Sequence, residues 1–204
     1  MKRTILSITL AGLCLNISAT AAQEIHPDRQ PLVPEILSQG DKQKLSREVL
    51  DSLFGKLHKA KSEKRAKLLA SAIWKIWSRS GSPTADLLLG QAERAMAAGQ
   101  QQIAISILST VIEQYPQFTQ AWNKRATAYF IANDYDSSLS DIKQVLDREP
   151  RHFGALSGMG MIYRHLGKNK KALSAFRRAL AIHPQLKDAR RAVKRLVGSI
   201  EQDI

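Results

Sequence analysis

The chain has 204 residues, of which 44% are hydrophobic and 24% charged, and its formal net charge is +13. This composition is too apolar for a chain that stays disordered along most of its length, and the length suits one domain or two small ones. No uncharged apolar run after the first two dozen residues is long enough to cross a bilayer, so we expect no transmembrane segment in the mature chain.

The N-terminal segment 1–22 has the pattern of an export signal. A basic start at Lys2 and Arg3 is followed by the apolar stretch 5–15 and by small residues at 19–21. We predict a signal peptide over 1–22 that is cleaved near Ala21 or Ala22, and hence a periplasmic protein. The alternative is an uncleaved membrane anchor, because no charge occurs between Arg3 and Glu24.

The single cysteine, Cys14, lies within this predicted signal. The residues before it are similar to a lipoprotein signal, but Leu13 is large where that motif has a small residue. Cleavage would leave no cysteine in the mature chain, which excludes disulfides, thiol catalysis and cysteine-based metal sites.

Residues 23–40 contain three of the seven prolines, so we predict an extended, flexible tether there. Residues 41–84 then show leucine and other apolar residues at helical spacing in two blocks, 44–60 and 63–79, which predicts a degenerate helical pair. Ser82 and Pro83 form an N-cap and a first-turn proline, which predicts that the next helix begins there.

A 34-residue repeat governs the rest of the chain. Pro116, Pro150 and Pro184 are evenly spaced by this period, and the same offset relates apolar or small residues in many further columns, for example Leu88, Trp122 and Leu156; Ala92, Ala126 and Gly160; Ala104, Ser138 and Ala172; Leu108, Ile142 and Phe176. The apolar residues of each unit form two blocks at helical spacing, so each unit is predicted to be a helical hairpin.

The residue types at special positions support this interpretation. Gly99, Asn133 and Gly167 fall between the two blocks and tolerate the left-handed backbone of a helix C-cap. The small residues at 92, 126 and 160 are expected where two helices cross closely, with Tyr129 or Tyr163 filling the space beside them. Residues 185–197 carry an apolar stripe on a basic helix, as a capping helix at the end of a repeat array should.

The 34-residue unit resembles the tetratricopeptide repeat (TPR). The match is closest in Trp122, Ala126, Tyr129 and Pro150, and again in Gly160, Tyr163, Phe176 and Pro184, and it is weaker in unit 85–118. The resemblance implies an all-α fold, a right-handed α-solenoid with TPR hairpins over 85–118, 119–152 and 153–186 and a capping helix and tail over 187–204. It also implies that Trp122 lies in the core.

In proteins of this family the first helices of the hairpins line a groove that binds a peptide or a helix of another protein. Carried onto this chain, the groove positions are Leu89, Glu93, Met96, Asn123, Thr127, Phe130, Ser157, Met161 and Arg164. These residues lack the basic clamp of the chaperone-binding members. The alternative for Phe130 and Met161 is that they only pack against the adjoining repeat.

Two basic segments flank an acidic middle, since residues 41–80 carry +7, residues 85–150 carry −3 and residues 151–204 carry +9. The basic residues that we single out are Lys56, Lys59, Lys61, Lys64, Arg65, Lys67, Lys187, Arg190, Arg191, Lys194 and Arg195. They predict a local positive field that attracts an anionic lipid or polymer. Nucleic acid is disfavoured because no aromatic residue interrupts either run. The alternative is a solvated surface that only keeps the protein soluble.

No pattern indicates catalysis. The five histidines include no pair at zinc-protease spacing, and Gly154, Gly158 and Gly160 lie in a helical repeat without the preceding strand of a phosphate loop. His183, before a repeat-ending proline, is expected to be a solvated loop residue. We therefore predict no enzyme activity, no metal and no cofactor, and a protein-binding adaptor or assembly factor of a bacterial cell envelope. The competing hypothesis is attachment to an anionic envelope surface through the basic segments.

Overall fold

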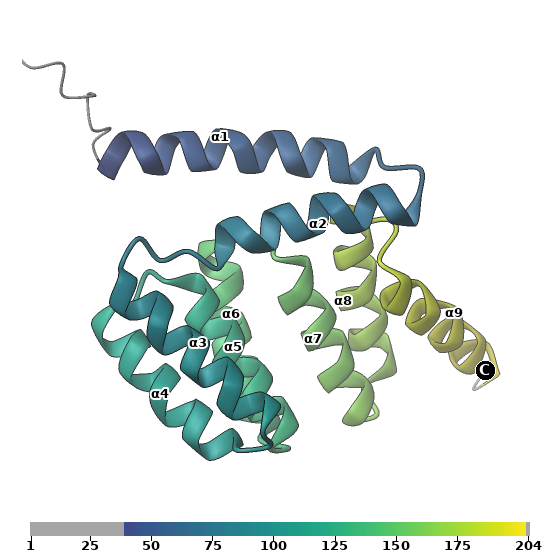
Figure 1. The fold of residues 1–204 in the computed structure, drawn as a ribbon. Coiled ribbons are helices and arrows are strands. Elements are labelled where there is room, and N and C mark those ends of the chain that lie inside the picture. The colour runs from purple at the N-terminus through teal and green to yellow at the C-terminus, as the bar shows by residue number, and fades with distance from the viewer. Residues whose placement is uncertain (1–38, 203–204) are drawn as a thin grey trace, which may run out of the picture. The chain divides into compact units, whose positions relative to one another are not determined.

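A computed structural model describes residues 39–202, which form helices and no strands (Figure 1). The helices are α1 (Gln39–His58), α2 (Glu63–Trp77), α3 (Pro83–Ala97), α4 (Gln101–Gln114), α5 (Thr119–Ile131), α6 (Tyr135–Arg148), α7 (Phe153–His165), α8 (Asn169–Ile182) and α9 (Lys187–Gln202). The predicted signal peptide, Cys14 and residues 23–38 of the predicted tether lie outside the described residues. None of the helices described is both long and apolar enough to span a membrane.

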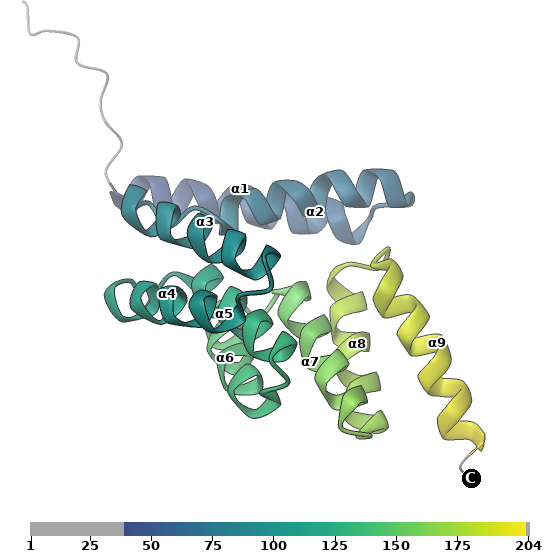
Figure 2. The same cartoon turned by 60° about the horizontal axis from the view of Figure 1, so that its bottom comes forward.

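Helices α3 to α9 form an α-solenoid of TPR type. Each helix packs on the next one in the chain, and α5 also contacts the first helices of the repeats on either side, α3 and α7 (Figure 2). We call α3 to α8 the repeat array. Its three hairpins and the capping helix α9 confirm the fold class that the 34-residue period predicts.

The turn inside each hairpin has the left-handed residue that the sequence predicts. Gly99, Asn133 and Gly167 have φ values of 74°, 61° and 68°. The residue after each donates its backbone N–H to a carbonyl in the last turn of the preceding helix, for example Asp134 to Tyr129 at 2.9 Å. Asparagine replaces glycine at 133 because its side chain tolerates this conformation better than other residues do.

Gly160 makes room for a different aromatic ring from the one that the sequence predicts. A Cβ atom on Gly160 would lie 2.8 Å from the ring of Phe176 in α8. The aromatic ring that fills the space is therefore Phe176, from the second helix of the same hairpin, and not Tyr163. Phe176 is 1% exposed and belongs to the core shared by α8 and α9.

Trp122 is only partly buried and packs at the edge of two apolar clusters. Its indole N–H donates to the carbonyl of Pro116 at 2.9 Å, and the guanidinium groups of Arg125 and Arg148 each lie 5.1 Å from its ring centroid. The expectation of a core tryptophan holds only in part, because two arginine side chains cover the part of the ring that the apolar clusters leave open.

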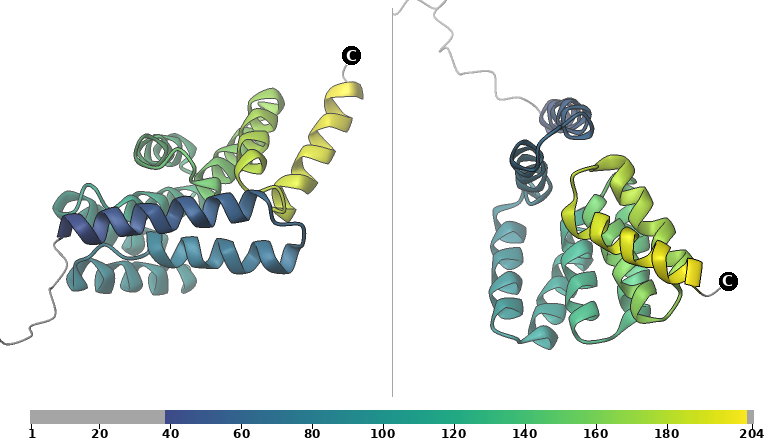
Figure 3. Two further views of the ribbon diagram at one scale, coloured as in Figure 1. Left: turned by 90° about the horizontal axis from the view of Figure 1, so that it is seen from above. Right: turned by 90° about the vertical axis from the view of Figure 1, so that its right-hand side faces the viewer.

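Helices α1 and α2, which we call the N-terminal pair, do form the predicted helical pair. They do not extend the solenoid at α3, however, but pack on the last repeat (Figure 3). Phe153 at the start of α7 and Ile182 at the end of α8 join the apolar cluster of the pair. Two links join the pair to residues far along the chain: His58 Nδ1 to the carbonyl of Ala181 at 2.9 Å, and Arg151 to Asp51 at 2.6 Å.

Two buried histidines lie at this junction. His152 is fully buried, stacks on Trp77 with ring centroids 4.1 Å apart, and accepts the N–H of Ala155 at 3.0 Å as the N-cap of α7. His183 is 5% exposed, and its ring stands perpendicular to that of Phe153 with the centroids 5.3 Å apart. The prediction of a solvated His183 was wrong, because the N-terminal pair covers the end of α8, which the repeat period alone does not reveal.

Candidate groove between the first helices of the repeats

Helices α3, α5 and α7 lie side by side and form one face of the repeat array, which we call the groove face. Between α5 and α7 this face contains a cavity of about 80 Å³. Its lining combines apolar, small and hydroxyl side chains: Asn123, Ala126, Thr127, Phe130, Ser138, Ile142, Gly154, Ala155, Gly158, Met161 and Ile162. Such a cavity has room for one small side chain rather than for a cofactor.

Phe130 lines this cavity from α5, and Met161 lines it from α7. Phe130 is partly buried, with Tyr135 and His165 at ring distances of 5.9 Å and 5.5 Å. Met161 is 37% exposed, so its flexible and polarizable side chain is accessible to a partner. Packing against the neighbouring repeat thus explains much of the burial of Phe130. It leaves a substantial part of the Met161 side chain exposed to solvent.

The other predicted groove positions divide by exposure. Asn123 and Thr127 line the cavity, and the Thr127 hydroxyl donates to the carbonyl of Asn123 at 2.9 Å. Leu89 is only 4% exposed inside the core of the first hairpin, so its side chain is not available to a partner. Met96 packs against the same core.

The charged and polar groove positions outside the cavity are accessible. Glu93 of α3 forms an ion pair with Lys124 of α5 at 2.7 Å, which links two neighbouring helices of the groove face. Arg164 is exposed near the end of α7, and Ser157 is partly exposed in its middle.

The small residues of α7 that open the cavity were not among the groove positions predicted from the sequence. Gly158 leaves room, since a Cβ there would lie 3.7 Å from Ile142, an ordinary contact. Gly154 lines the cavity and also faces the N-terminal pair, because a Cβ on it would lie 2.7 Å from the ring of Trp74. The N-terminal pair therefore borders the groove face, and no repeat column could have shown this.

An ion pair with a buried carboxylate holds α5 in place behind the groove face. Arg125 donates two hydrogen bonds of 2.8 Å to the carboxylate of Asp141 in α6, and a third of 3.0 Å to Ser109 in α4. The hydrogen bond to Asp141 raises the pKa of Arg125 against the lowering effect of its burial. The sequence carried a signal for this pair, since both residues are charged where the other repeats have neutral ones, Gln91 and Met159, or Ile107 and Ala175.

The predicted basic residues are exposed on both segments. Lys56, Lys59, Lys61, Lys64, Arg65 and Lys67 surround the turn between α1 and α2, and the basic residues of α9 are likewise exposed. Among the described residues there is no group of three or more His, Cys, Asp or Glu side chains that could hold a metal ion.

Comparison with known proteins identifies the repeat. The profile of a family described as Tetratricopeptide repeat matches residues 89–141 and 124–187. A TPR repeat-containing protein of Rhizobium etli is 37% identical over 151 residues, which cover 74% of each chain. The chain belongs to the tetratricopeptide repeat family.

Solved TPR structures share the fold at low sequence identity. The Sgt2 TPR domain from Aspergillus fumigatus superposes with a TM-score of 0.56 at 19% identity, covering 60% of this chain and 82% of that domain. The first TPR of Spaghetti (RPAP3), bound to an HSP90 peptide, superposes with a TM-score of 0.55 at 20% identity, covering 57% and 93%. For the TPR chain described here these structures establish the α-solenoid fold.

Proposed function

We propose that this TPR protein is a non-enzymatic interaction module that binds a peptide or helix of a partner protein on its groove face. The observation that carries the proposal is the cavity between α5 and α7 with Met161 exposed at its rim. An apolar cavity flanked by a few polar groups is a common way to anchor one side chain of a partner. The peptide bound to the Spaghetti TPR supports the same use of the fold.

We further propose that the protein acts as an adaptor or assembly factor of a bacterial cell envelope. This part rests on the predicted signal peptide over 1–22, which lies outside the described residues. It is tested by the N-terminal sequence of the protein isolated from its own cells, which should begin near Gln23, and by recovery in the periplasmic fraction.

The groove is tested by photo-crosslinking in intact cells, with a photoreactive amino acid placed at Thr127 or Met161 and, as control, at Gln102. Gln102 is exposed on α4, a second helix of a repeat. We expect a partner protein to be captured from the two groove positions and not from Gln102. Capture of the same proteins from all three positions would contradict a groove site.

A cavity-filling variant separates binding from folding. Gly158→Leu places a side chain in the cavity, and we expect it to weaken capture by about 2 kcal/mol, the scale of a binding hot spot. Gly90→Leu is the matched control, because position 90 of α3 is the same repeat column but does not line the cavity. Both variants should keep the helical circular dichroism spectrum, since replacing a mid-helix glycine improves helix propensity. Unchanged capture by Gly158→Leu would exclude the cavity as the anchor.

A further inference from the structure

The fold joins the two basic segments, which are far apart in the sequence, at one end of the N-terminal pair. The side chain of Gln185 connects them: its Nε2 donates to the carbonyl of Ala60 at 3.3 Å, and its Oε1 accepts from Arg190 of α9 at 2.9 Å. The turn between α1 and α2 therefore lies beside the start of α9, as the views in Figures 1 and 2 also show.

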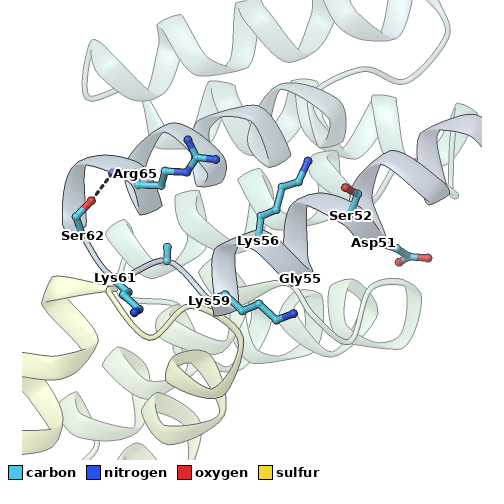
Figure 4. A pocket seen from close by; sticks show the side chains of 9 residues that line it. Asp51, Ser52, Gly55, Lys56, Lys59, Lys61, Ser62 and Arg65 are labelled. Carbon is cyan, nitrogen blue, oxygen red and sulfur yellow. Dashed lines mark hydrogen bonds between the residues drawn. The ribbon is translucent and has the colours of Figure 1, made fainter.

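The turn itself holds a shallow hollow of about 640 Å³ that is rich in cations (Figure 4). Lys56 lines it from α1, Lys59 and Lys61 line it from the turn, and Arg65 lines it from α2. None of the ion pairs described in the structure involves these four cations. The carboxylate of Asp51, which also lines the hollow, is paired with Arg151 at 2.6 Å.

A second basic hollow lies on the outer surface of α8. It measures about 570 Å³ and is lined by Lys170, Arg177 and Arg178 together with Ala181. The carbonyl of Ala181 accepts the hydrogen bond from His58, which lies in the last turn of α1 beside Lys59. The basic residues of α8 were not singled out in the sequence, because only the packing of α1 on α8 brings them next to the turn.

We propose that this end of the molecule binds the anionic headgroups of a phospholipid bilayer. The elbow surface, as we call it, consists of those cations of the two hollows that lie next to the turn and those in the first turn of α9: Lys56, Lys59, Lys61, Arg65, Arg177, Arg178, Lys187 and Arg190. The nearby carboxylates are fewer: Asp51 and Asp188 are paired with arginines, and Glu63 is exposed in the first turn of α2. This surface is separate from the groove face, so it adds a second partner to the proposed function.

The lack of an accessible aromatic ring favours a lipid surface over nucleic acid. Lysine and arginine side chains are attracted to an anionic membrane by its surface potential, whereas proteins that bind single-stranded nucleic acid also stack the bases on aromatic rings. Aromatic rings of the N-terminal pair are turned inward: Phe54 of α1 is 6% exposed, and Trp77 at the end of α2 stacks on the buried ring of His152. No ring of the elbow surface is available for stacking on a base.

The test measures binding of the full chain to lipid vesicles by co-sedimentation. The vesicles contain phosphatidylcholine alone or phosphatidylcholine mixed with anionic phosphatidylglycerol, so that any apolar attachment by residues 1–22 contributes equally to both. Each cation near an anionic surface strengthens binding about fivefold, so Lys56→Gln with Lys59→Gln should weaken binding to the anionic vesicles about 25-fold. The matched control is Lys75→Gln with Arg79→Gln, which removes the same charge from exposed residues at the other end of α2.

The proposal predicts binding that prefers anionic vesicles, falls with the elbow variant far more than with the control, and is lost in about 1 M salt, where charges are screened within about 3 Å. Three results would overturn it: no preference for anionic vesicles, equal losses in the two double variants, or binding of a single-stranded oligonucleotide in place of the vesicles. Gly158→Leu should bind the vesicles like the unmodified chain, so failure here is distinguishable from failure of the groove.

Discussion

The repeat array and the N-terminal pair are held in place by different kinds of contact. In the array the buried polar groups have partners: Ser138 donates to the carbonyl of Ala126 at 2.7 Å, and Arg125 neutralises Asp141. At the junction of the pair with the last repeat, three buried nitrogen atoms have no hydrogen-bond partner in the structure, on Trp77, His152 and His183. The junction is therefore stabilised by aromatic packing that is opposed by unsatisfied polar groups.

The two regions also differ in how far along the chain their contacts reach. Each hairpin of the array contacts its neighbours in sequence, as in other solenoids. The pair instead contacts residues 75 to 125 positions away, for example Trp77 with His152 and Ala60 with Gln185. Closing so long a loop costs conformational entropy, so we expect the pair to detach under milder conditions than those that unfold the array.

The largest effect is expected from the array. Arg125→Ala leaves Asp141 buried without a counter-ion, and we expect it to lower the free energy of unfolding by about 3 kcal/mol. The measurement is urea unfolding followed by circular dichroism at a fixed pH. Lys143→Ala is the control, because its pair with Asp147 is exposed and should contribute less than about 0.5 kcal/mol. Equal effects of the two substitutions would show that the array does not depend on the buried pair.

A fall in pH should act on the pair and spare the array. Burial lowers the pKa of His152 from 6.5 to about 3 and also lowers that of His183. When the pair is detached, His152 can bind a proton that the docked form excludes. The free energy of docking is therefore largest above pH 6.5, and it decreases as the pH falls from 6.5 to about 3. Protonation of His152 in the detached form should lower the free energy of docking by about 2 kcal/mol near pH 5.

Tryptophan fluorescence can follow this change, because Trp74 and Trp77 belong to the pair and Trp122 belongs to the array. In a Trp122→Phe background we expect the emission to shift as the pH falls, with little loss of helical signal. His152→Asn should flatten the shift, since asparagine can also cap α7 but does not titrate. The charged groups beside His152 are Arg151, Glu149 and Asp51. A shift that persists unchanged in His152→Asn would assign it to these groups or to His183.

The smallest expected effects come from two glycine substitutions in α7, one of which should destabilise the pair and the other the array. Gly154→Ala drives a methyl group into Trp74 of the pair, and Gly160→Ala drives one into Phe176 of the array. After the gain in helix propensity, each clash should cost about 1 kcal/mol. We expect Gly154→Ala to raise hydrogen exchange in α1 and α2 only, and Gly160→Ala to raise it in α7 and α8. Exchange that rises throughout the chain in both variants would mean that the two regions unfold together.

The sequence predicts the repeat array closely and the N-terminal pair only in part. The constant repeat period places the turns at Gly99, Asn133 and Gly167, and Ser82 caps α3 by accepting the N–H of Ala85. These features are local or repeat along the chain, so they can be found without coordinates. The position of the N-terminal pair depends on contacts between segments far apart in the chain, for which a single sequence carries no periodic signal.

The same distinction applies to the candidate site. The resemblance to the TPR family predicts Thr127, Phe130 and Met161 as groove residues, and the structure brings them together around the cavity. The period could not show that Leu89 is covered by its own hairpin, nor that Trp74 borders the groove at Gly154. The burial of a side chain at a groove position depends on its neighbours in three dimensions, and these differ between equivalent columns of the repeat.

The attachment of the N-terminal pair to α7 and α8 has a consequence for how this architecture can change in length. Open solenoids gain or lose hairpins by duplication or deletion, because each unit needs only an adjacent unit. Here the residues that follow α2 must enter α3 at Pro83, while α1 and α2 remain docked on the last hairpin. Inserting one more hairpin between α6 and α7 would carry the docking surface away from the pair, so this protein cannot lengthen by simple duplication without releasing its first two helices.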